Sequence, residues 1–196
     1  MGEPILRFTL DTNCLIDIDE ARPAGGDVLA LVDAARRGAA DVAILASSAS
    51  EQQPGGAHLD SFAAFQARMI DLGLGDIALL KPIAKYGLSF WDFALIGDEA
   101  SVERERQIFE ALFPGTPSDW PTYASANGLD PEDLFSRPAW KWRNRLCDVQ
   151  AIWSHLNDER DFFVTRDKNF RRLNRTVEFA HAISVTPAEA VALLSA

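Results

Sequence analysis

Short apolar runs alternate with helix-length segments along this chain, and that alternation limits the folds it can adopt. The runs lie near residues 5–10, 42–46, 162–165 and 182–185. Capped or amphipathic segments lie between them, a pattern typical of parallel βαβ units. Ligands bind beyond the carboxyl ends of the strands in such sheets. The sequence therefore predicts an α/β fold with a central parallel sheet and functional residues just after the apolar runs.

The length and composition fit one domain over residues 1–196. With 47% hydrophobic and 24% charged residues, the chain can bury a core of ordinary size. No apolar stretch approaches a membrane span, and the amino-terminal stretch resembles no signal peptide. Two cysteines, Cys14 and Cys147, imply no disulfide framework. We expect a cytoplasmic protein with no membrane partner.

Acidic residues are the expected start signals of three helices. Asp27 is expected to cap a helix over 27–37 that stops at Gly38, Asp60 a helix over 62–71, and Asp98 a helix over 100–113. These boundaries rest on residue type alone.

The remaining helix predictions lie beyond residue 113. Residues 114–131 are expected to be a loop, and Asp130 with Pro131 a helix start. Pro138 is expected to break or kink the chain before a long helix from Ala139 to about Asn157. Near the C-terminus, residues 186–189 form a predicted capping box that opens the last helix.

Four acidic residues lie at or near the ends of the apolar runs. Asp11 follows the first run directly, Glu51 comes about one turn after the second, and Asp167 comes two residues after the third. Asp148 is on the long helix upstream of that third run. Each residue alone could be a cap or an exposed group, but crowded carboxylates either bind cations or keep protons. The four together predict a Mg²⁺ or Mn²⁺ site, because these ions prefer oxygen ligands.

The charge distribution favours a phosphate-bearing partner in spite of a net charge of −10. Residues 137–175 carry ten basic and five acidic side chains, and this segment contains both Asp148 and Asp167. A positive rim attracts phosphate locally, whereas the alternative is a set of solvated helix faces. Trp140 and Trp142 could stack on RNA bases or belong to the core. The candidate RNA contacts are Arg143, Arg145, Arg166, Lys168 and Arg171.

Four segments in this chain resemble a known family. LDTNCLIDI at 10–18, SSASE at 47–51, CDVQAIWSHL at 147–156 and FVTRDKNF at 163–170 are similar to the signature segments of PIN-domain ribonucleases. The similarity is strongest to VapC-type toxins of bacterial toxin–antitoxin pairs. It covers about the first 55 and the last 50 residues, in the family's order.

The resemblance implies a fold, an activity and partners. The fold would be a three-layer α/β/α domain with a PIN-like central sheet and a mainly helical insert at about 55–138. The activity would be Mg²⁺- or Mn²⁺-dependent hydrolysis of phosphodiester bonds in structured RNA. The implied partners are an RNA substrate, a cognate antitoxin protein and a second copy of the chain in a homodimer.

The resemblance also implies roles for individual residues. Asp11, Glu51, Asp148 and Asp167 would be the catalytic and metal-binding quartet. Thr12 or Asn13, together with Thr165, would orient the carboxylates or a metal-bound water. Asn169 stands where the family often has a second Asp, so a further ligand would be neutral here.

Other interpretations of the same residues stay open. A PIN-like module that binds RNA or protein, with structural acids, is the main alternative. A phosphatase with Asp11 as nucleophile lacks its general acid, because residue 13 is Asn. A zinc enzyme is disfavoured by the scattered histidines. Asp17, Asp19, Asp92 and Asp98 are expected to be surface groups or caps, with Asp17 and Asp92 as candidates for a supporting role near the metal.

Overall fold

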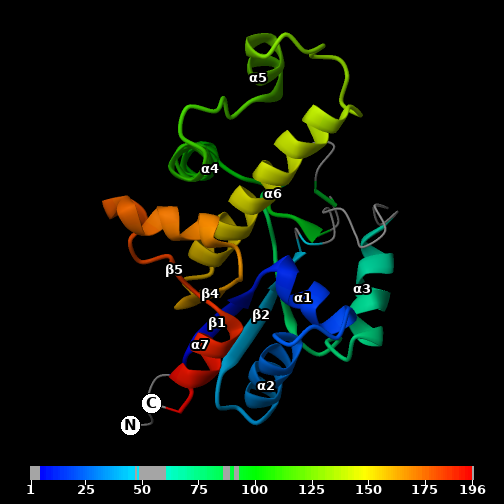
Figure 1. Ribbon diagram of the computed structural model, residues 1–196, viewed down its shortest axis with the longest axis vertical. Coiled ribbons are helices and arrows are strands. Elements are labelled where there is room, and N and C mark those ends of the chain that lie inside the picture. The colour runs from blue at the N-terminus through cyan, green and yellow to red at the C-terminus, as the bar shows by residue number, and fades with distance from the viewer. Residues whose placement is uncertain (1–4, 47, 49–60, 86–88, 91–92, 196) are drawn as a thin grey trace.

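A five-stranded, fully parallel sheet forms the centre of the protein. The structure is a computed structural model that describes residues 5–46, 48, 61–85, 89–90 and 93–195. The strands are β1 (Arg7–Leu10), β2 (Asp41–Leu45), β3 (Ala78–Leu80), β4 (Phe162–Val164) and β5 (Ile183–Val185), in the spatial order β3-β2-β1-β4-β5 (Figure 1). All four pairings are parallel, which confirms the α/β class and the parallel sheet.

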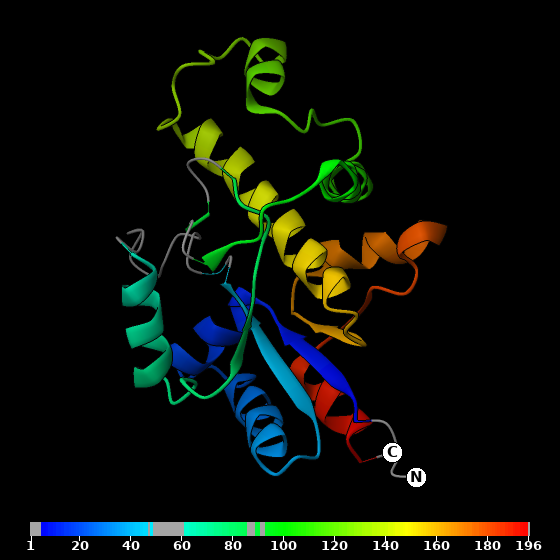
Figure 2. The same cartoon turned by 180° about the vertical axis from the view of Figure 1, so that it is seen from behind.

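Helices cover both faces of this sheet because the side chains of the central strands alternate between two cores. In β2, Val42 and Ile44 join the core beside α1 (Thr12–Asp19), α2 (Gly25–Arg36), α3 (Phe62–Asp71) and α7 (Pro187–Leu193). Ala43 and Leu45 join the opposite core, beside α4 (Glu99–Leu112) and α6 (Arg137–Asn157). Figure 2 shows the sheet from behind, between these helices. Strands buried on both faces explain the continuous apolar runs in the sequence.

Two helix starts near the N-terminus differ from their predictions. The N-cap of α2 is Ala24, and Asp27 lies in the first turn, because the helix begins two residues earlier than expected. Ser61 caps α3 by accepting a hydrogen bond from the amide of Ala64. Asp60, the expected cap, lies outside the described residues. Gly38, with a φ of 73°, ends α2 as predicted, since this conformation suits glycine.

The region between α4 and α6 was predicted less well. Asp98 caps α4 as expected, but the predicted loop contains α5 (Trp120–Ala126), which Asp119 caps. Asp130 starts no helix: its side chain accepts from the amide of Glu132 in a turn. Ser136 caps α6, so Pro138 lies in the first turn, where its missing N–H costs nothing.

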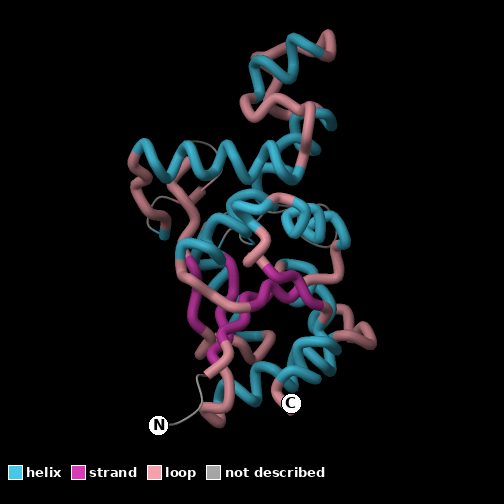
Figure 3. The backbone as a smooth tube through the Cα atoms, turned by 90° about the vertical axis from the view of Figure 1, so that its left-hand side faces the viewer, coloured by secondary structure: helices cyan, strands magenta, loops and turns pink. Residues whose placement is uncertain are grey.

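The remaining elements are two 3₁₀ segments and the last helix after β4, the α5 lobe, and the edge strand β3. After β4 come the 3₁₀ segments η3 (Lys168–Arg175) and η4 (Val177–Phe179), and Thr186 and Glu189 form the predicted capping box of α7. α5 lies at the far end from the sheet, in a small lobe with the start of α6 (Figures 1 and 3). β3, within the interval predicted as an insert, is an edge strand of the sheet.

No helix in the described part of the chain has the length and apolar character that crossing a bilayer requires.

Candidate metal centre at the carboxyl edge of the sheet

The strand order places a topological switch point, called the crevice below, at the carboxyl ends of β1 and β4. From β1 the chain proceeds to β2 on one side, whereas β4 and β5 lie on the other side. This reversal of direction is where open α/β sheets bind ligands. Asp11 and Thr165 are the first residues beyond β1 and β4. The amide of Asp11 donates to the carbonyl of Val164 at 3.0 Å, which holds the two strand ends together.

Asp11 lies in this crevice as a buried carboxylate with several donors. Its side chain caps α1, accepting from the amide of Thr12 at 2.8 Å. Its other oxygen accepts from the hydroxyl of Thr165 at 2.7 Å and from the amide group of Asn13 at 2.5 Å. Asn13 also donates to the Thr165 hydroxyl at 2.8 Å. All three residues named for orienting carboxylates contact Asp11, Thr12 through its backbone amide and Asn13 and Thr165 through their side chains.

Thr12 connects the crevice to the end of β2. Its hydroxyl lies 2.7 Å from the hydroxyl of Ser48, and both side chains are buried. Ser48 belongs to the SSASE segment that ends at Glu51. Glu51 itself lies outside the described residues, so its position relative to Asp11 remains a prediction.

Asp167 joins Asp11 through Thr165. The Thr165 hydroxyl accepts from the amide of Asp167 at 3.0 Å while it donates to Asp11. The Asp167 carboxylate accepts from the amide of Asn169 at 2.8 Å and from its side chain at 3.3 Å. Asn169 therefore supports Asp167 directly.

The electrostatics of the crevice favour a proton or a cation near Asp11. Burial raises the pKa of Asp11 to about 6, against the opposing effect of hydrogen bonds from Thr165 and Thr12, and the negative charge of Asp167 raises it further. A bound cation would remove the cost of that buried charge. The oxygen donors of Asp11 and Asp167 thus suit Mg²⁺ or Mn²⁺.

The fourth predicted ligand is on a different element. Asp148 lies half-buried on α6, between the buried residues Cys147 and Val149. Within the described ranges, no three acidic, histidine or cysteine side chains gather closely enough to hold an ion. The structure brings Asp11 and Asp167 together and leaves Asp148 outside that pair.

An ion pair that the sequence did not indicate holds the segment before Asp167. The Arg166 guanidinium donates to both oxygens of Asp17, at 2.6 and 2.5 Å, and Arg22 lies 3.6 Å from the same carboxylate. Asp17 is fully buried, so the expectation that it is a surface group or cap is wrong. It shares the buried face of α1 with Cys14, three residues earlier, and that spacing was the available signal.

The other predicted RNA contacts have different surroundings. The Arg145 guanidinium lies over the rings of Phe113 and Tyr123, 5.8 and 5.5 Å from their centroids. Arg143 lies over the ring of Trp140 at 5.7 Å. Lys168 and Arg171 line a small cavity of about 40 Å³ beside Thr165 and Asp167. Those two basic residues are therefore adjacent to the crevice.

Trp142 and both cysteines belong to the interior. The Trp142 indole donates to the carbonyl of Pro117 at 3.1 Å, and its ring packs near Trp120 and Phe109. This placement favours the core role over base stacking for Trp142. Cys14 and Cys147 are buried helix residues, as predicted.

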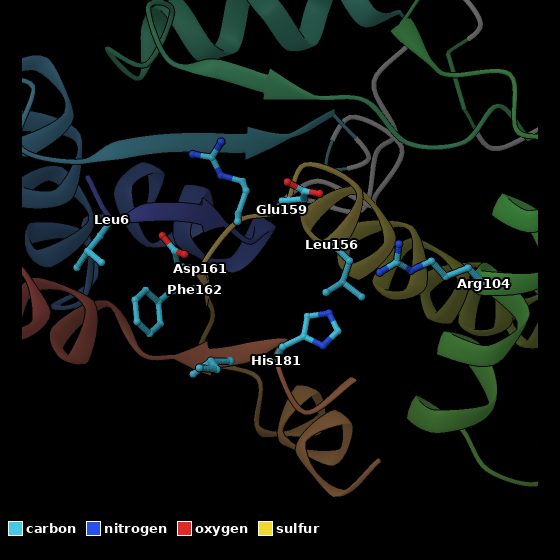
Figure 4. Close-up of a pocket in the computed structure, with 9 residues that line it drawn as sticks. Leu6, Arg104, Leu156, Glu159, Asp161, Phe162 and His181 are labelled. Carbon is cyan, nitrogen blue, oxygen red and sulfur yellow. The ribbon is translucent and has the colours of Figure 1, made fainter. Parts of the chain in front are cut away.

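A larger cavity of about 560 Å³ lies at the opposite edge of the sheet (Figure 4). Its lining comes from residues at or just before the strand starts and includes Glu159, Asp161 and His181, together with Arg104 of α4. The mixed charges and the distance along the strands from Asp11 separate this cavity from the crevice. It supplies no ligand to the candidate centre.

Comparisons of the chain with protein-family models, with curated proteins and with solved structures find no match.

Proposed function

We propose that this chain is a PIN-like, metal-dependent endoribonuclease. The observation that supports the proposal is the buried Asp11 carboxylate, which lies next to Asp167 at the switch point of a parallel sheet. A buried carboxylate with a raised pKa and an acidic neighbour at such a place is a candidate functional group, because active sites are where burial and like charges shift pKa values. The fold would be a three-layer α/β/α arrangement of the PIN type.

The proposed metal ligands are Asp11 and Asp167, with Glu51 and Asp148 completing the set. When bound, the ion would polarise a phosphoryl oxygen and lower the pKa of an attacking water. Asn13 and Thr165 would fix the orientation of Asp11, because both donate to the same carboxylate oxygen. Lys168 and Arg171 would attract the phosphate backbone beside Asp167.

A cleavage assay tests this proposal directly. Purified protein with Mn²⁺ or Mg²⁺ is expected to cut structured RNA, and EDTA is expected to stop the reaction. Asp11→Asn keeps the shape of the side chain but removes its charge, and we expect activity to fall at least a hundredfold. Asp71→Asn, an exposed change on α3, is the matched control. Full activity of Asp11→Asn would sink the proposal.

The biological role we propose is that of the toxin in a type II toxin–antitoxin pair. Expression in a bacterial host is then expected to arrest growth, whereas Asp11→Asn is expected to be tolerated. A small DNA-binding protein encoded beside this chain would be the antitoxin and would relieve the arrest. A chain that forms a homodimer would show twice its mass by light scattering.

A second candidate function is a PIN-like module that binds RNA or protein without cutting. The structure gathers two carboxylates in the crevice, and a pair that caps a helix and orders a turn can be purely structural. Calorimetry separates the two functions. The nuclease should bind Mn²⁺ in a manner that Asp11→Asn or Asp148→Asn abolishes, whereas the binding module should not.

A further inference from the structure

One face of α6 runs from the α5 lobe to the candidate metal ligand Asp148. Arg137, Lys141, Asn144 and Asp148 are spaced so that they fall within about 60° of each other around the helix. The first three side chains are exposed, and Asp148 is half-buried. The other side of this half of α6 packs on Trp120 and Ala124 of α5. This face is therefore exposed from the lobe as far as Asn144, and the half-buried Asp148 follows one turn later.

Before Asp148 the face carries two basic side chains, Arg137 and Lys141, the neutral Asn144 and no acidic side chain. Residues 137–147 contain four basic side chains and no acidic one. Asp133, in the preceding turn, uses a carboxylate oxygen to accept from the amides of Phe135 and Ser136, as part of the α6 start. Arg137 and Lys141 can therefore contact phosphates without an acidic neighbour in their own turns of the helix.

An exposed aromatic residue, Phe135, directly precedes the N-cap of α6 at the outer end of the helix. Phe135 is 82% exposed, a large fraction for a phenylalanine. Trp140 lies beside it: the indole donates to the Phe135 carbonyl at 2.7 Å, and Arg143 covers the tryptophan ring. Trp140 is thus held in place, and the ring of Phe135 is free to stack on a base.

We propose that this face of α6, with Phe135 at its outer end, is a track that binds an unpaired segment of RNA. Phosphates would contact Arg137 and Lys141, and a base would stack on Phe135. The inference deepens the proposed nuclease function, on which it rests, by naming an unpaired segment within a structured RNA as the part that the protein binds. From residue 137 to residue 148 the helix rises about 16 Å, the length of roughly five stacked nucleotides.

The combination of groups favours unpaired over paired RNA. In a duplex the faces of the bases are stacked on each other and closed to an aromatic side chain. A basic stripe that ends in an exposed ring is instead the arrangement that single-strand binding surfaces use. An acidic protein partner would use the charges but would not need base stacking.

Fluorescence anisotropy with a labelled oligouridylate tests the track. The full chain is used in EDTA, so that binding is measured without cleavage. Phe135→Ala is expected to weaken binding roughly tenfold, whereas Phe135→Tyr keeps the stacking surface and the affinity. Lys141→Gln is expected to weaken binding and to lower the salt slope by about one. Arg37→Gln, at the exposed end of α2, removes the same charge elsewhere and should change little.

The outcomes distinguish the track from the nuclease. Wild-type affinity in Phe135→Ala and Lys141→Gln overturns the track, as does equal or tighter binding of a duplex. Cleavage without a measurable role for these residues leaves the nuclease standing and removes the track. Binding that depends on Phe135, without any cleavage in Mn²⁺, supports the track and removes the nuclease. Matching melting temperatures show that the exposed substitutions leave the fold intact.

Discussion

Asp11 carries a charge that the folded protein accommodates at a cost. Its pKa is about 6 in the folded state, against 3.8 in the unfolded chain. Between those values the folded state keeps a proton that the unfolded chain has released, so stability falls as pH rises from about 4 to 6. At 1.36 kcal/mol per pKa unit, ionised Asp11 costs about 3 kcal/mol at neutral pH.

Removal of this charge should change the pH dependence of folding in a defined direction. We expect Asp11→Asn to have near wild-type stability at pH 4 and to gain up to about 3 kcal/mol over wild type by pH 7. Urea unfolding at several pH values measures the difference. Asp71→Asn should stay within about 0.5 kcal/mol of wild type throughout. If the free energy of unfolding of Asp11→Asn and of wild type changed with pH in parallel, the raised pKa of Asp11 would be contradicted.

His155 should make the folding stability change with pH in the direction opposite to that of Asp11. Burial lowers its pKa to about 3, helped by the positive charges of Arg160 and His181, and its Nδ1 lies 2.9 Å from the Thr9 hydroxyl. The unfolded chain takes up a proton below its normal pKa of 6.5, so His155 removes stability as pH falls from 6.5 towards 3. The two slopes oppose each other in wild type between about pH 4 and 6. The Asp11→Asn curve should therefore rise more steeply with pH.

Arg166 is expected to matter for stability as well as for the position of Asp167. Among the residues that the structure describes, its removal leaves the buried Asp17 carboxylate with only the longer ion pair to Arg22. We expect Arg166→Ala to cost roughly 3 kcal/mol in chemical unfolding. Arg166→Lys should recover only part of that, because an ammonium group cannot reproduce the two parallel hydrogen bonds.

A second substitution shows whether the loss comes from the buried charge. In Arg166→Ala combined with Asp17→Asn, no carboxylate is left buried without its partner. The double variant should be more stable than Arg166→Ala alone. If the two substitutions cost stability additively, the ion pair does not couple α1 to the segment after β4.

At the level of elements, the contact between α1 and α2 depends on a glycine. A Cβ atom at Gly25 would lie 2.5 Å from the carbonyl oxygen of Asp17, whereas one at Gly26 would meet nothing within 4 Å. We expect Gly25→Ala to destabilise the fold by about 1–3 kcal/mol, since backbone must move to accept it. Gly26→Ala, one residue away in the same helix, should be neutral or slightly stabilising. Thermal unfolding of the pair tests this, and equal melting temperatures would contradict the close packing.

The elements that could be predicted from sequence are those with local signals. Apolar runs located four strands, and Asp98 and the box formed by Thr186 and Glu189 located two helix starts. Helix α5 was missed because its cap, Asp119, lies among residues typical of a loop. Asp130 was predicted to be a helix start because Asp followed by Pro matches the local start signal, but the observed helix α6 is capped by Ser136. Local patterns do not choose between two adjacent candidates for a cap.

Within the candidate site, too, some contacts could be predicted from local sequence signals and others could not. Strand-end placement predicted that Asp11 and Asp167 would lie near each other, since adjacent parallel strands end at the same edge. The pairing of Asp17 with Arg166 joins residues 149 positions apart and depends on how α1 packs, which a single sequence does not specify. Tertiary packing also decided which arginines face aromatic rings and which face the crevice.

At the scale of the whole molecule, the two cores that flank the sheet are much larger than the core of the α5 lobe. The lobe's core contains Trp120, Ala124 and Ala139 as its buried apolar residues. Local opening free energy depends on buried apolar contacts, so the lobe should open more readily than the sheet. Native-state hydrogen exchange is expected to show α5 amides exchanging by a local route, and β1 amides only by global unfolding.

Two variants, one in the α5 lobe and one in the sheet, test whether the two parts open separately. Trp120→Ala removes the tryptophan that is buried in the lobe's core and its hydrogen bond to the Pro131 carbonyl, and should speed exchange in α5 while leaving β1 nearly unchanged. Ile44→Ala in β2 should speed exchange in the sheet, and in α5 only when the whole molecule unfolds. If Trp120→Ala lowers protection equally in both places, the lobe and the sheet form one cooperative unit. An independent lobe would instead allow the outer end of α6 to adjust to RNA without cost to the crevice.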